Sequence, residues 1–260
     1  MLYDDPIVFL GEPGRSHLHV FFGNTGSNAF STAESLRSSG NSTCRGGIAN
    51  RSSYWVPATV DSHGVPLKPI DSDFYYQSGF QLQPEQIGTI PPGLRMIAGN
   101  NPKDNDAPRS QHVRYTCSND PVWIPHENFP DCPAGETVIA VVDFPQCWDG
   151  VSLDSANHRS HMAYPQNFRC PASHPHPIPL IAFNIKYVVP AGDNARNWRL
   201  SSDTYSASEP GGRSLHGDYF FGWEPEVIDQ IVHECASRPV NCKSHLIGRE
   251  GSTGRYQVIY

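Results

Sequence analysis

Short runs of strand-like composition recur along the whole chain, each bounded by Gly, Pro, Asn, Asp or Ser. They cover residues 15–22, 54–60, 74–81, 94–98, 113–117, 137–144, 179–189, 215–221 and 256–260. This spacing, with few helical segments between the runs, favours a sandwich or barrel over alternating βα units. We therefore predict a mainly β protein, a single-domain β-sandwich of jelly-roll type with long loops, over residues 1–260.

The sequence pattern predicts a short helix in each of two segments. Ser31 and Glu34 have the spacing of a capping box, and Gly40 is placed to end the helix that they begin. Residues 224–236 carry an apolar stripe at helical spacing, behind a proline in the first turn. We expect this second helix to pack against a sheet.

The composition is that of a folded domain. Of the 260 residues, 38% are hydrophobic, 11% are aromatic and only 17% are charged, which argues against disorder. The 22 glycines and 24 prolines are spread along the chain, so they indicate turns and ordered loops. With a net charge of −7 and no run of basic residues, the chain is not expected to bind nucleic acid. No apolar stretch approaches the roughly 20 residues that a membrane span requires.

The cysteines indicate an oxidising compartment. No Cys-x-x-Cys pair occurs, so disulfides fit better than a zinc ribbon or a thioredoxin-like motif. The candidate local pairs are Cys117 with Cys132, Cys147 with Cys170, and Cys235 with Cys242, and Cys44 is the candidate for the seventh, unpaired thiol. Residues 1–6 lack the basic and apolar parts of a signal peptide, so we expect the mature region of a secreted protein whose leader has been removed.

The segment from Arg15 to Gly23 carries the first candidate site. Alternate side chains of a strand share a face, so Leu18, Val20 and Phe22 should point to the core. Arg15, His17 and His19 then lie together on the opposite face. Two histidines and an arginine on one sheet face suggest a wet cleft, although they could also be ordinary surface residues.

A second candidate is the segment from Cys147 to Tyr164. A loop anchored by a disulfide could carry acid–base groups into a cleft. Its alternative role is purely structural, with polar groups that satisfy the backbone of the loop. The candidate residues of this segment are Trp148, Asp149, Asp154, His158, Arg159, His161 and Tyr164.

Two further strands contribute candidates. His216 and Asp218 share a face of one strand, so the carboxylate could orient or charge a neighbouring imidazole. Residues 179–189 alternate, with Asn184 and Lys186 on the polar face, where they could contact a ligand.

Several of these motifs together resemble a known family. They are residues 16–23 (SHLHVFFG), 53–58 (SYWVPA), 147–150 (CWDG), 158–165 (HRSHMAYP), 170–171 (CP) and 216–220 (HGDYF). In this order they are similar to a secreted domain of unknown function, found in fungi and actinobacteria and often joined to WSC or ricin-type carbohydrate-binding modules. The resemblance implies secretion and a carbohydrate setting, and it carries no catalytic mechanism.

We therefore expect an extracellular enzyme that acts on polysaccharide or cell-wall glycan, and two chemistries are open. A lyase needs a base, an acid and groups that neutralise a uronate carboxylate. Its candidates are His17, His19 or His216 as base, Tyr164 or Tyr219 as acid, and Arg15, Arg159, Asn184 or Lys186 as neutralisers. A glycoside hydrolase needs two carboxyl groups, for which Asp149, Asp154 and Asp218 are available. Trp55, Trp148 and Trp223 could stack on sugar rings.

Two alternatives remain open. His17 and His19, together with His161 or His216, could bind zinc or copper, although the enzyme reading requires no cofactor. The same cleft could instead bind a glycan without turnover, as a lectin-like or cell-wall-binding domain. The expected state is a monomer.

Overall fold

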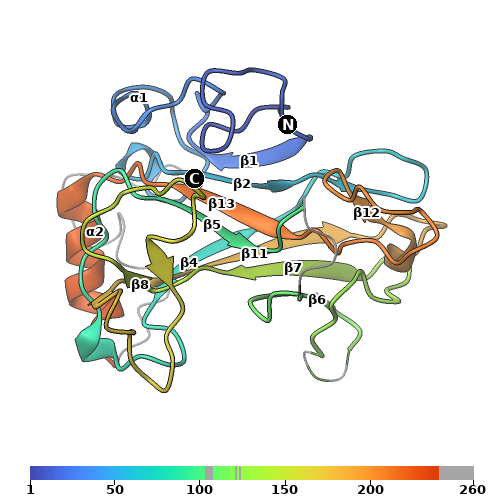
Figure 1. The fold of residues 1–260 in the computed structure, drawn as a ribbon. Coiled ribbons are helices and arrows are strands. Elements are labelled where there is room, and N and C mark those ends of the chain that lie inside the picture. The colour runs from blue at the N-terminus through green and yellow to red at the C-terminus, as the bar shows by residue number, and fades with distance from the viewer. Residues whose placement is uncertain (103–107, 121, 123, 240–260) are drawn as a thin grey trace.

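The computed structural model describes residues 1–102, 108–120, 122 and 124–239, which form a mainly β protein. Two four-stranded antiparallel sheets are stacked face to face (Figure 1), and a three-stranded and a two-stranded sheet of short strands lie beside them. The predicted strand at 256–260 lies outside the described residues. The first sheet has the order β1-β2-β13-β5. It contains β1 (His19–Gly23), β2 (Ser53–Pro57), β13 (His216–Phe220) and β5 (Arg95–Gly99).

The second sheet has the order β4-β11-β7-β6. It contains β4 (Asp73–Gln77), β11 (Leu180–Val188), β7 (Thr137–Asp143) and β6 (Val113–Cys117). The chain changes sheets between β2 and β4, between β4 and β5, between β5 and β6, and again between β11 and β13. The predicted β-sandwich is therefore confirmed, and the predicted strand at 113–117 has the observed bounds.

The main core lies between the two sheets and follows from the alternation of side chains. Tyr54 of β2 and Tyr219 of β13 point inward, and the ring of Tyr54 lies 5.6 Å from the ring of Phe183 on β11. Gly217 of β13 lets the two sheets approach each other closely, because a Cβ atom at this position would lie 3.1 Å from the Phe183 ring. The inward face predicted for residues 179–189 is also observed, with Ile181, Phe183, Ile185 and Tyr187 in the core.

The outer face of the first sheet is covered by the N-terminal part of the chain, drawn in blue above the sheet in Figure 1. A second hydrophobic cluster lies between them, in which Ile7 and Leu36 pack against Trp55, Ile97 and Phe220. The helix α1 (Ala33–Ser38) belongs to this cover. A sheet that would otherwise be wet on one side is thus buried on both faces.

The start of the first strand differs from the prediction. Residues 15–18 precede β1, because this stretch is bonded to the N-terminal segment: the Ser16 amide donates to the Tyr3 carbonyl at 3.1 Å. An isolated bridge also pairs Leu2 with His19. The two histidines nevertheless keep the predicted relation to the core, since Val20 lies in it and Leu18 and Phe22 pack against it.

The predicted cap of α1 is wrong by one residue. Thr32 is the N-cap, and its side chain and that of Ser35 exchange hydrogen bonds with each other's backbone amides. The Ser31 hydroxyl instead accepts a hydrogen bond from the Asn28 amide at 3.0 Å. The capping box is thus built from Thr32 and Ser35, because Ser31 is occupied by the preceding turn.

The second helix is confirmed. It runs as α2 (Pro225–Ile231) and continues as a π-helical turn, η4 (Val232–Ala236). Val227, Ile228 and Ile231 are buried on its apolar face, as the stripe predicts. The remaining short elements are η1 (Gly47–Ala49), β3 (Thr59–Val60), η2 (Pro84–Gln86), β8 (Cys147–Trp148), β9 (Met162–Ala163), β10 (His176–Pro177), η3 (Ala195–Asn197) and β12 (Arg199–Leu200). Among them, β10-β8-β9 form the three-stranded sheet and β12-β3 form the two-stranded sheet.

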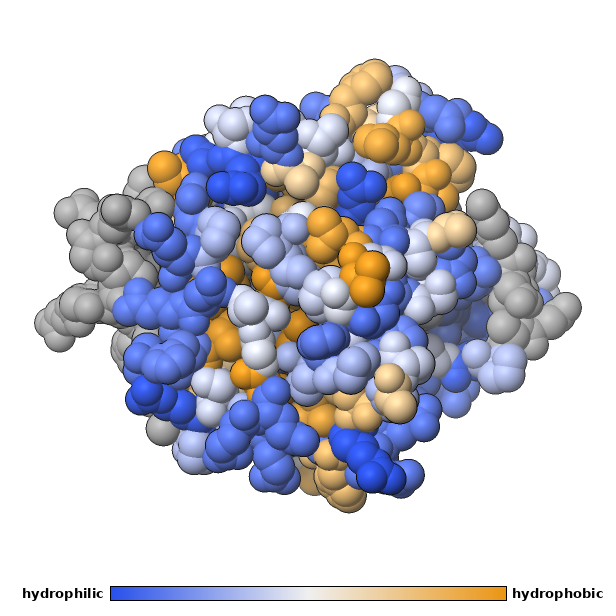
Figure 2. All heavy atoms as spheres, turned by 60° about the vertical axis from the view of Figure 1, so that its left-hand side comes forward, coloured by the Kyte–Doolittle hydropathy of each residue, from blue (hydrophilic) through white to orange (hydrophobic). Residues whose placement is uncertain are grey.

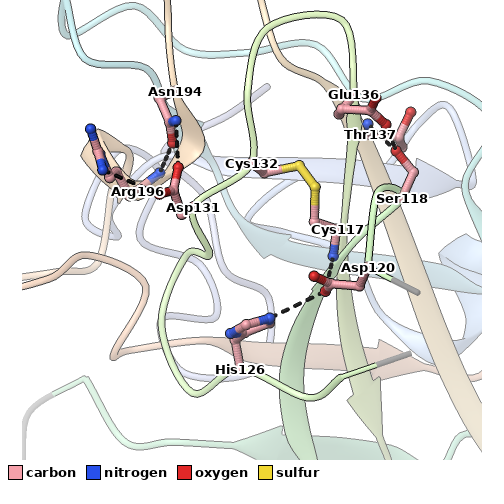
Figure 3. Close-up of a disulfide and its surroundings, with 10 residues drawn as sticks. All are labelled: Cys117, Ser118, Asp120, His126, Asp131, Cys132, Glu136, Thr137, Asn194 and Arg196. Atoms are coloured by element: carbon pink, nitrogen blue, oxygen red, sulfur yellow. Dashed lines mark hydrogen bonds and ion pairs between the residues drawn. A yellow bond between two sulfur atoms is a disulfide. The ribbon is translucent and has the colours of Figure 1, made fainter. Parts of the chain in front are cut away.

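Two predicted disulfides are present, Cys117–Cys132 and Cys147–Cys170, and Cys44 is free. The first joins the end of β6 to the segment before β7, beside the contact of Asp120 with His126 (Figure 3). The third predicted pair includes Cys242, which lies outside the described residues.

The surface has polar character. On the face shown in Figure 2, hydrophobic side chains form small separate groups among polar ones, as on surfaces that face water. Within the described part of the chain, no helix is both long and apolar enough to cross a membrane.

Candidate functional site

Three histidines meet on the outer face of the first sheet. His19 begins β1, His17 lies two residues before it, and His216 begins β13, which is separated from β1 only by β2. The ring centroids lie 4.2 Å apart for His17 and His19, 5.1 Å for His17 and His216, and 6.0 Å for His19 and His216. One nitrogen of each ring lies within 4.8 Å of the other two. We call these three residues the histidine centre.

Two of the rings are held by backbone carbonyl groups. Nδ1 of His19 lies 2.9 Å from the Asp4 oxygen, and Nδ1 of His216 lies 2.7 Å from the Ser214 oxygen. A carbonyl oxygen can only accept, so both Nδ1 atoms carry the proton and both Nε2 atoms carry a lone pair. Histidine ligands of metal ions are typically oriented in this way, with the second ring nitrogen donating to a carbonyl or carboxylate.

Burial keeps the rings neutral. His19 is 0% exposed and His216 is 4% exposed, whereas His17 is half-buried. Desolvation lowers the pKa of His17 to about 4, and desolvation together with the neighbouring His17 lowers the pKa of His19 to about 3. Desolvation and the other two rings also lower the pKa of His216 well below its usual value. At neutral pH the histidine centre therefore presents unprotonated nitrogens.

A buried carboxyl group lies beside the histidine centre. Asp218 shares the outward face of β13 with His216, and its Oδ2 lies 3.9 Å from Nε2 of that histidine. It is 1% exposed, and burial followed by the charge of Asp5 raises its pKa, against the opposing charge of Arg159. The Arg159 guanidinium donates to the Gly99 carbonyl at 2.9 Å, next to the strand pair of Gly99 with His216.

This group of polar atoms is poorly satisfied. Within the described residues, Nε2 of His17, Nε2 of His19 and Oδ2 of Asp218 are buried and have no hydrogen-bond partner. Each such atom costs about 1–3 kcal/mol. Native folds contain few of them, and they concentrate where a ligand or a reaction uses them.

The loop between Cys147 and Tyr164 holds its acidic groups by internal contacts. Asp149 accepts the amides of Val151 and Ser152, each at 2.8 Å. Asp154 lies 2.9 Å from Nδ1 of His158 and 3.4 Å from the Arg95 guanidinium. These contacts agree with the alternative interpretation, in which the polar groups of the loop serve its own structure.

The same loop contains two further candidates, Trp148 and His161, that lie outside the histidine centre. Trp148 donates its indole N–H to the Ser152 carbonyl at 2.7 Å. His161 is buried; its Nε2 lies 2.7 Å from the Arg95 carbonyl and its Nδ1 lies 3.0 Å from the Ser155 hydroxyl. The third ring of the centre is therefore His216.

The candidate substrate contacts are dispersed. Arg15 is exposed and pairs with Glu12. Tyr164 stacks on the His112 ring at 3.4 Å and donates its hydroxyl to the Asp143 carbonyl. Trp55 is fully buried and stacks on Phe21, so its ring fills the second hydrophobic cluster and is closed to a sugar.

Three other candidates do not lie on the outer face of the first sheet, where the histidine centre is. Tyr219 points into the core between the sheets. Asn184 and Lys186 lie on the outer face of the second sheet, where Lys186 pairs with Asp73 at 2.6 Å. The structure does not bring these three residues to the histidine centre.

The sequence gives no signal for some groups that shape the centre. The Asp4 and Ser214 carbonyls orient two rings through the backbone, which any residue type could do. Asp5 acts on Asp218 across the chain, and its own carboxylate caps the following turn through the Ile7 amide at 3.0 Å. These residues can be recognised as part of the site only from their positions in the folded protein.

A second group of possible metal ligands comprises Asp61, His63 and Asp193. Asp61 accepts the amides of His63 and Val65, and Asp193 accepts the Trp198 indole at 2.7 Å. His63 is exposed, and both carboxylates serve their own loops. This group therefore lacks the unsatisfied buried atoms of the histidine centre.

Comparison with known proteins places the chain in a family. A model described as "Domain of unknown function (DUF1996)" matches residues 5–223, a range that contains the histidine centre, Asp218 and the disulfides Cys117–Cys132 and Cys147–Cys170. Neither a curated protein nor a solved structure matches the chain. The match covers far more than half of the sequence, and the chain therefore belongs to the DUF1996 family.

Proposed function

We propose that this protein is a secreted metalloenzyme, that the histidine centre holds one zinc or copper ion, and that its substrate is an extracellular polysaccharide. The observation that carries the metal is the arrangement of the imidazoles. The rings of His19 and His216 are fixed through Nδ1 by carbonyl groups, and the buried Nε2 atoms of His17 and His19 have no hydrogen-bond partner among the described residues.

The ligand chemistry agrees with this choice. Three imidazoles and an open position are a common catalytic arrangement for zinc, and imidazole also suits copper. Tetrahedral coordination at about 2.0–2.1 Å needs nitrogens roughly 3.3 Å apart. The nitrogens of the histidine centre lie within 4.8 Å of one another, so small ring movements would suffice.

The other chemistries receive less support. A carboxylate pair would have to use Asp149 or Asp154, and both are engaged within their own loop. A lyase would need a free phenol, but Tyr164 donates to a carbonyl and Tyr219 lies in the core. A bound ion would supply Lewis-acid chemistry and activate water. The three rings would hold such an ion, with the buried Asp218 carboxyl group beside it and the Arg159 guanidinium as the opposing charge near Asp218.

The proposal of a polysaccharide substrate rests on the expected compartment of the protein and on the family resemblance. The two disulfides within the described residues are typical of an oxidising compartment outside the cytosol. The family resemblance adds the frequent association with carbohydrate-binding modules. His17 is the most exposed member of the centre, so a substrate would approach from its side.

The test is metal binding by protein without a histidine tag. After stripping with chelator, zinc and copper are titrated against a chromophoric competitor, and bound metal is measured by mass spectrometry. We expect one equivalent per chain, and a loss of about 100-fold or more in affinity for His19→Ala and His216→Ala. His233→Ala, at an exposed position, should bind like the wild type.

The polysaccharide part is measured separately. Metal-loaded, stripped and His19→Ala proteins are incubated with neutral, acidic and amino polysaccharides, and reducing ends and unsaturated uronates are recorded. We expect product only from the loaded wild type. Absence of stoichiometric metal overturns the metal centre; bound metal with every polymer intact overturns the polysaccharide substrate and retains the metal.

A further inference from the structure

We propose that Ser155 and His161 form a second catalytic pair, a nucleophile and its base, that hydrolyses small acyl esters. The two residues lie on the disulfide-closed loop, outside the histidine centre. The Ser155 hydroxyl lies 3.0 Å from Nδ1 of His161. A pair of this kind needs a hydrogen bond from the nucleophile to the base, and a third group that orients the base.

The third group here is a backbone carbonyl. Nε2 of His161 lies 2.7 Å from the Arg95 oxygen, which can only accept, so this nitrogen carries the proton. Nδ1 then carries the lone pair, and the Ser155 hydroxyl must be the donor. The Arg95 carbonyl thus selects the tautomer that a general base requires, as a carboxylate does in a catalytic triad.

A competing contact does not change this assignment. The Ser155 hydroxyl also lies 3.1 Å from Oδ1 of Asn157. That oxygen already accepts the amides of Arg159 and Ser160 at 3.1 and 2.8 Å. If the hydroxyl proton pointed there, two lone pairs would face each other between Ser155 and His161.

The two partners differ in exposure as a nucleophile and its base should. His161 is 1% exposed, and desolvation lowers its pKa, so the ring is neutral at pH 7. Ser155 is only half-buried, at the first position of a turn closed by the His158 amide at 2.8 Å from its carbonyl. A small ester can therefore reach the hydroxyl while the base stays fixed.

The turn also offers donors for a developing oxyanion. The next two residues, Ala156 and Asn157, are exposed, and within the described residues their backbone N–H groups have no hydrogen-bond partner. The amide that follows a serine nucleophile is a common oxyanion donor.

The reaction balances with water alone. The Ser155 oxygen attacks the ester carbonyl carbon while Nδ1 of His161 takes the hydroxyl proton. The alkoxy group leaves as the alcohol with that proton, and an acyl-serine forms. Water, deprotonated by the same nitrogen, then attacks the acyl carbon; the carboxylic acid leaves and the proton returns to Ser155.

Two readouts test the pair on the full chain. The first is labelling by phenylmethylsulfonyl fluoride, mapped by peptide mass spectrometry, which we expect at Ser155 in native but not in urea-unfolded protein. The second is hydrolysis of p-nitrophenyl acetate, which we expect to fall about 100-fold or more in Ser155→Ala and in His161→Asn. Ser160→Ala, on the same loop, is the matched control and should leave both readouts unchanged.

Both readouts are repeated after metal stripping. Labelling and ester hydrolysis should both persist in the stripped protein, because the Ser155–His161 pair uses no residue of the histidine centre. Native protein without a label at Ser155 overturns the proposal even if a variant misfolds. Ester hydrolysis that survives in folded Ser155→Ala also overturns it, and neither result bears on metal binding.

Discussion

Asp218 is a buried acidic residue beside the histidine centre. Its Oδ2 has no hydrogen-bond partner among the described residues, and the group is 1% exposed. Burial raises its pKa, and a raised pKa in the folded state means that stability is lost as the pH rises from about 3.9 through the folded value. In metal-free protein at pH 8 this carboxyl group is therefore destabilising, whereas a cation among the three rings would offset its charge.

The variant Asp218→Asn should separate these two effects. In chelator at pH 8, we expect its free energy of unfolding to be about 1–3 kcal/mol higher than that of the wild type, because no charge must be buried. In the presence of metal, its affinity should be several-fold lower, because the ion loses a negative neighbour. Urea unfolding with and without zinc measures both. A variant that is less stable than the wild type in chelator would contradict this account.

At the scale of elements, the disulfide-closed loop is a unit of its own. Cys147 and Cys170 have a sequence separation of 23, and the loop that they close contains β8, β9 and the Ser155–His161 pair. The three rings of the histidine centre come instead from β1, from the stretch just before it, and from β13. The loop contacts the first sheet at Arg95, whose carbonyl holds His161 and whose guanidinium approaches Asp154, and through Arg159, which donates to the Gly99 carbonyl. Local disorder of this loop should therefore affect the two proposed sites differently.

Removing each of the two described disulfides in turn tests whether the two proposed sites are independent. The double variant Cys147→Ser/Cys170→Ser should lose about 3 kcal/mol of unfolding free energy through the freed loop, and should lose sulfonyl labelling of Ser155. Its zinc stoichiometry should stay at one. The double variant Cys117→Ser/Cys132→Ser should lose a similar free energy and keep the label. Equal loss of labelling in both variants would show that general destabilisation is the cause.

At the scale of the whole molecule, the N-terminal cover creates the environment of the histidine centre. It buries the outer face of the first sheet and supplies the Asp4 carbonyl that holds His19. The neutral rings follow from this burial, with pKa values of about 4 for His17 and about 3 for His19. Unfolded histidine titrates near 6.5. Between that pH and the folded values, the unfolded chain binds protons that the native protein does not, so stability falls as the pH falls.

Metal-free protein should therefore be acid-sensitive below about pH 6.5. As the pH falls, each such histidine adds up to about 1.4 kcal/mol per pH unit to the loss of unfolding free energy. His19→Gln should make the slope shallower by about one such increment, and His233→Gln, at an exposed position, should not. Urea unfolding in chelator at pH 7, 6 and 5 gives the three slopes. Identical slopes for the wild type and His19→Gln would indicate that His19 is charged in the folded state.

Much of the fold was predictable from local pattern. Alternation placed Val20 inward and His19 outward, and the same rule put Phe183 in the core and Lys186 outside it. The pairings Cys117–Cys132 and Cys147–Cys170 followed from proximity along the chain. The cap of α1 was missed because Ser31 and Thr32 both suit an N-cap, and the turn before the helix decided between them.

The sequence by itself determined the β character, the faces of the strands and the histidine-rich outer face, because these depend on side-chain alternation within single strands. Only the tertiary structure decided which histidines meet. His216 joined His17 and His19 because β2 alone separates β1 from β13, while His161 was drawn to the Arg95 carbonyl. Strand order and the N-terminal cover depend on contacts between distant segments, and no periodicity within one segment encodes such contacts.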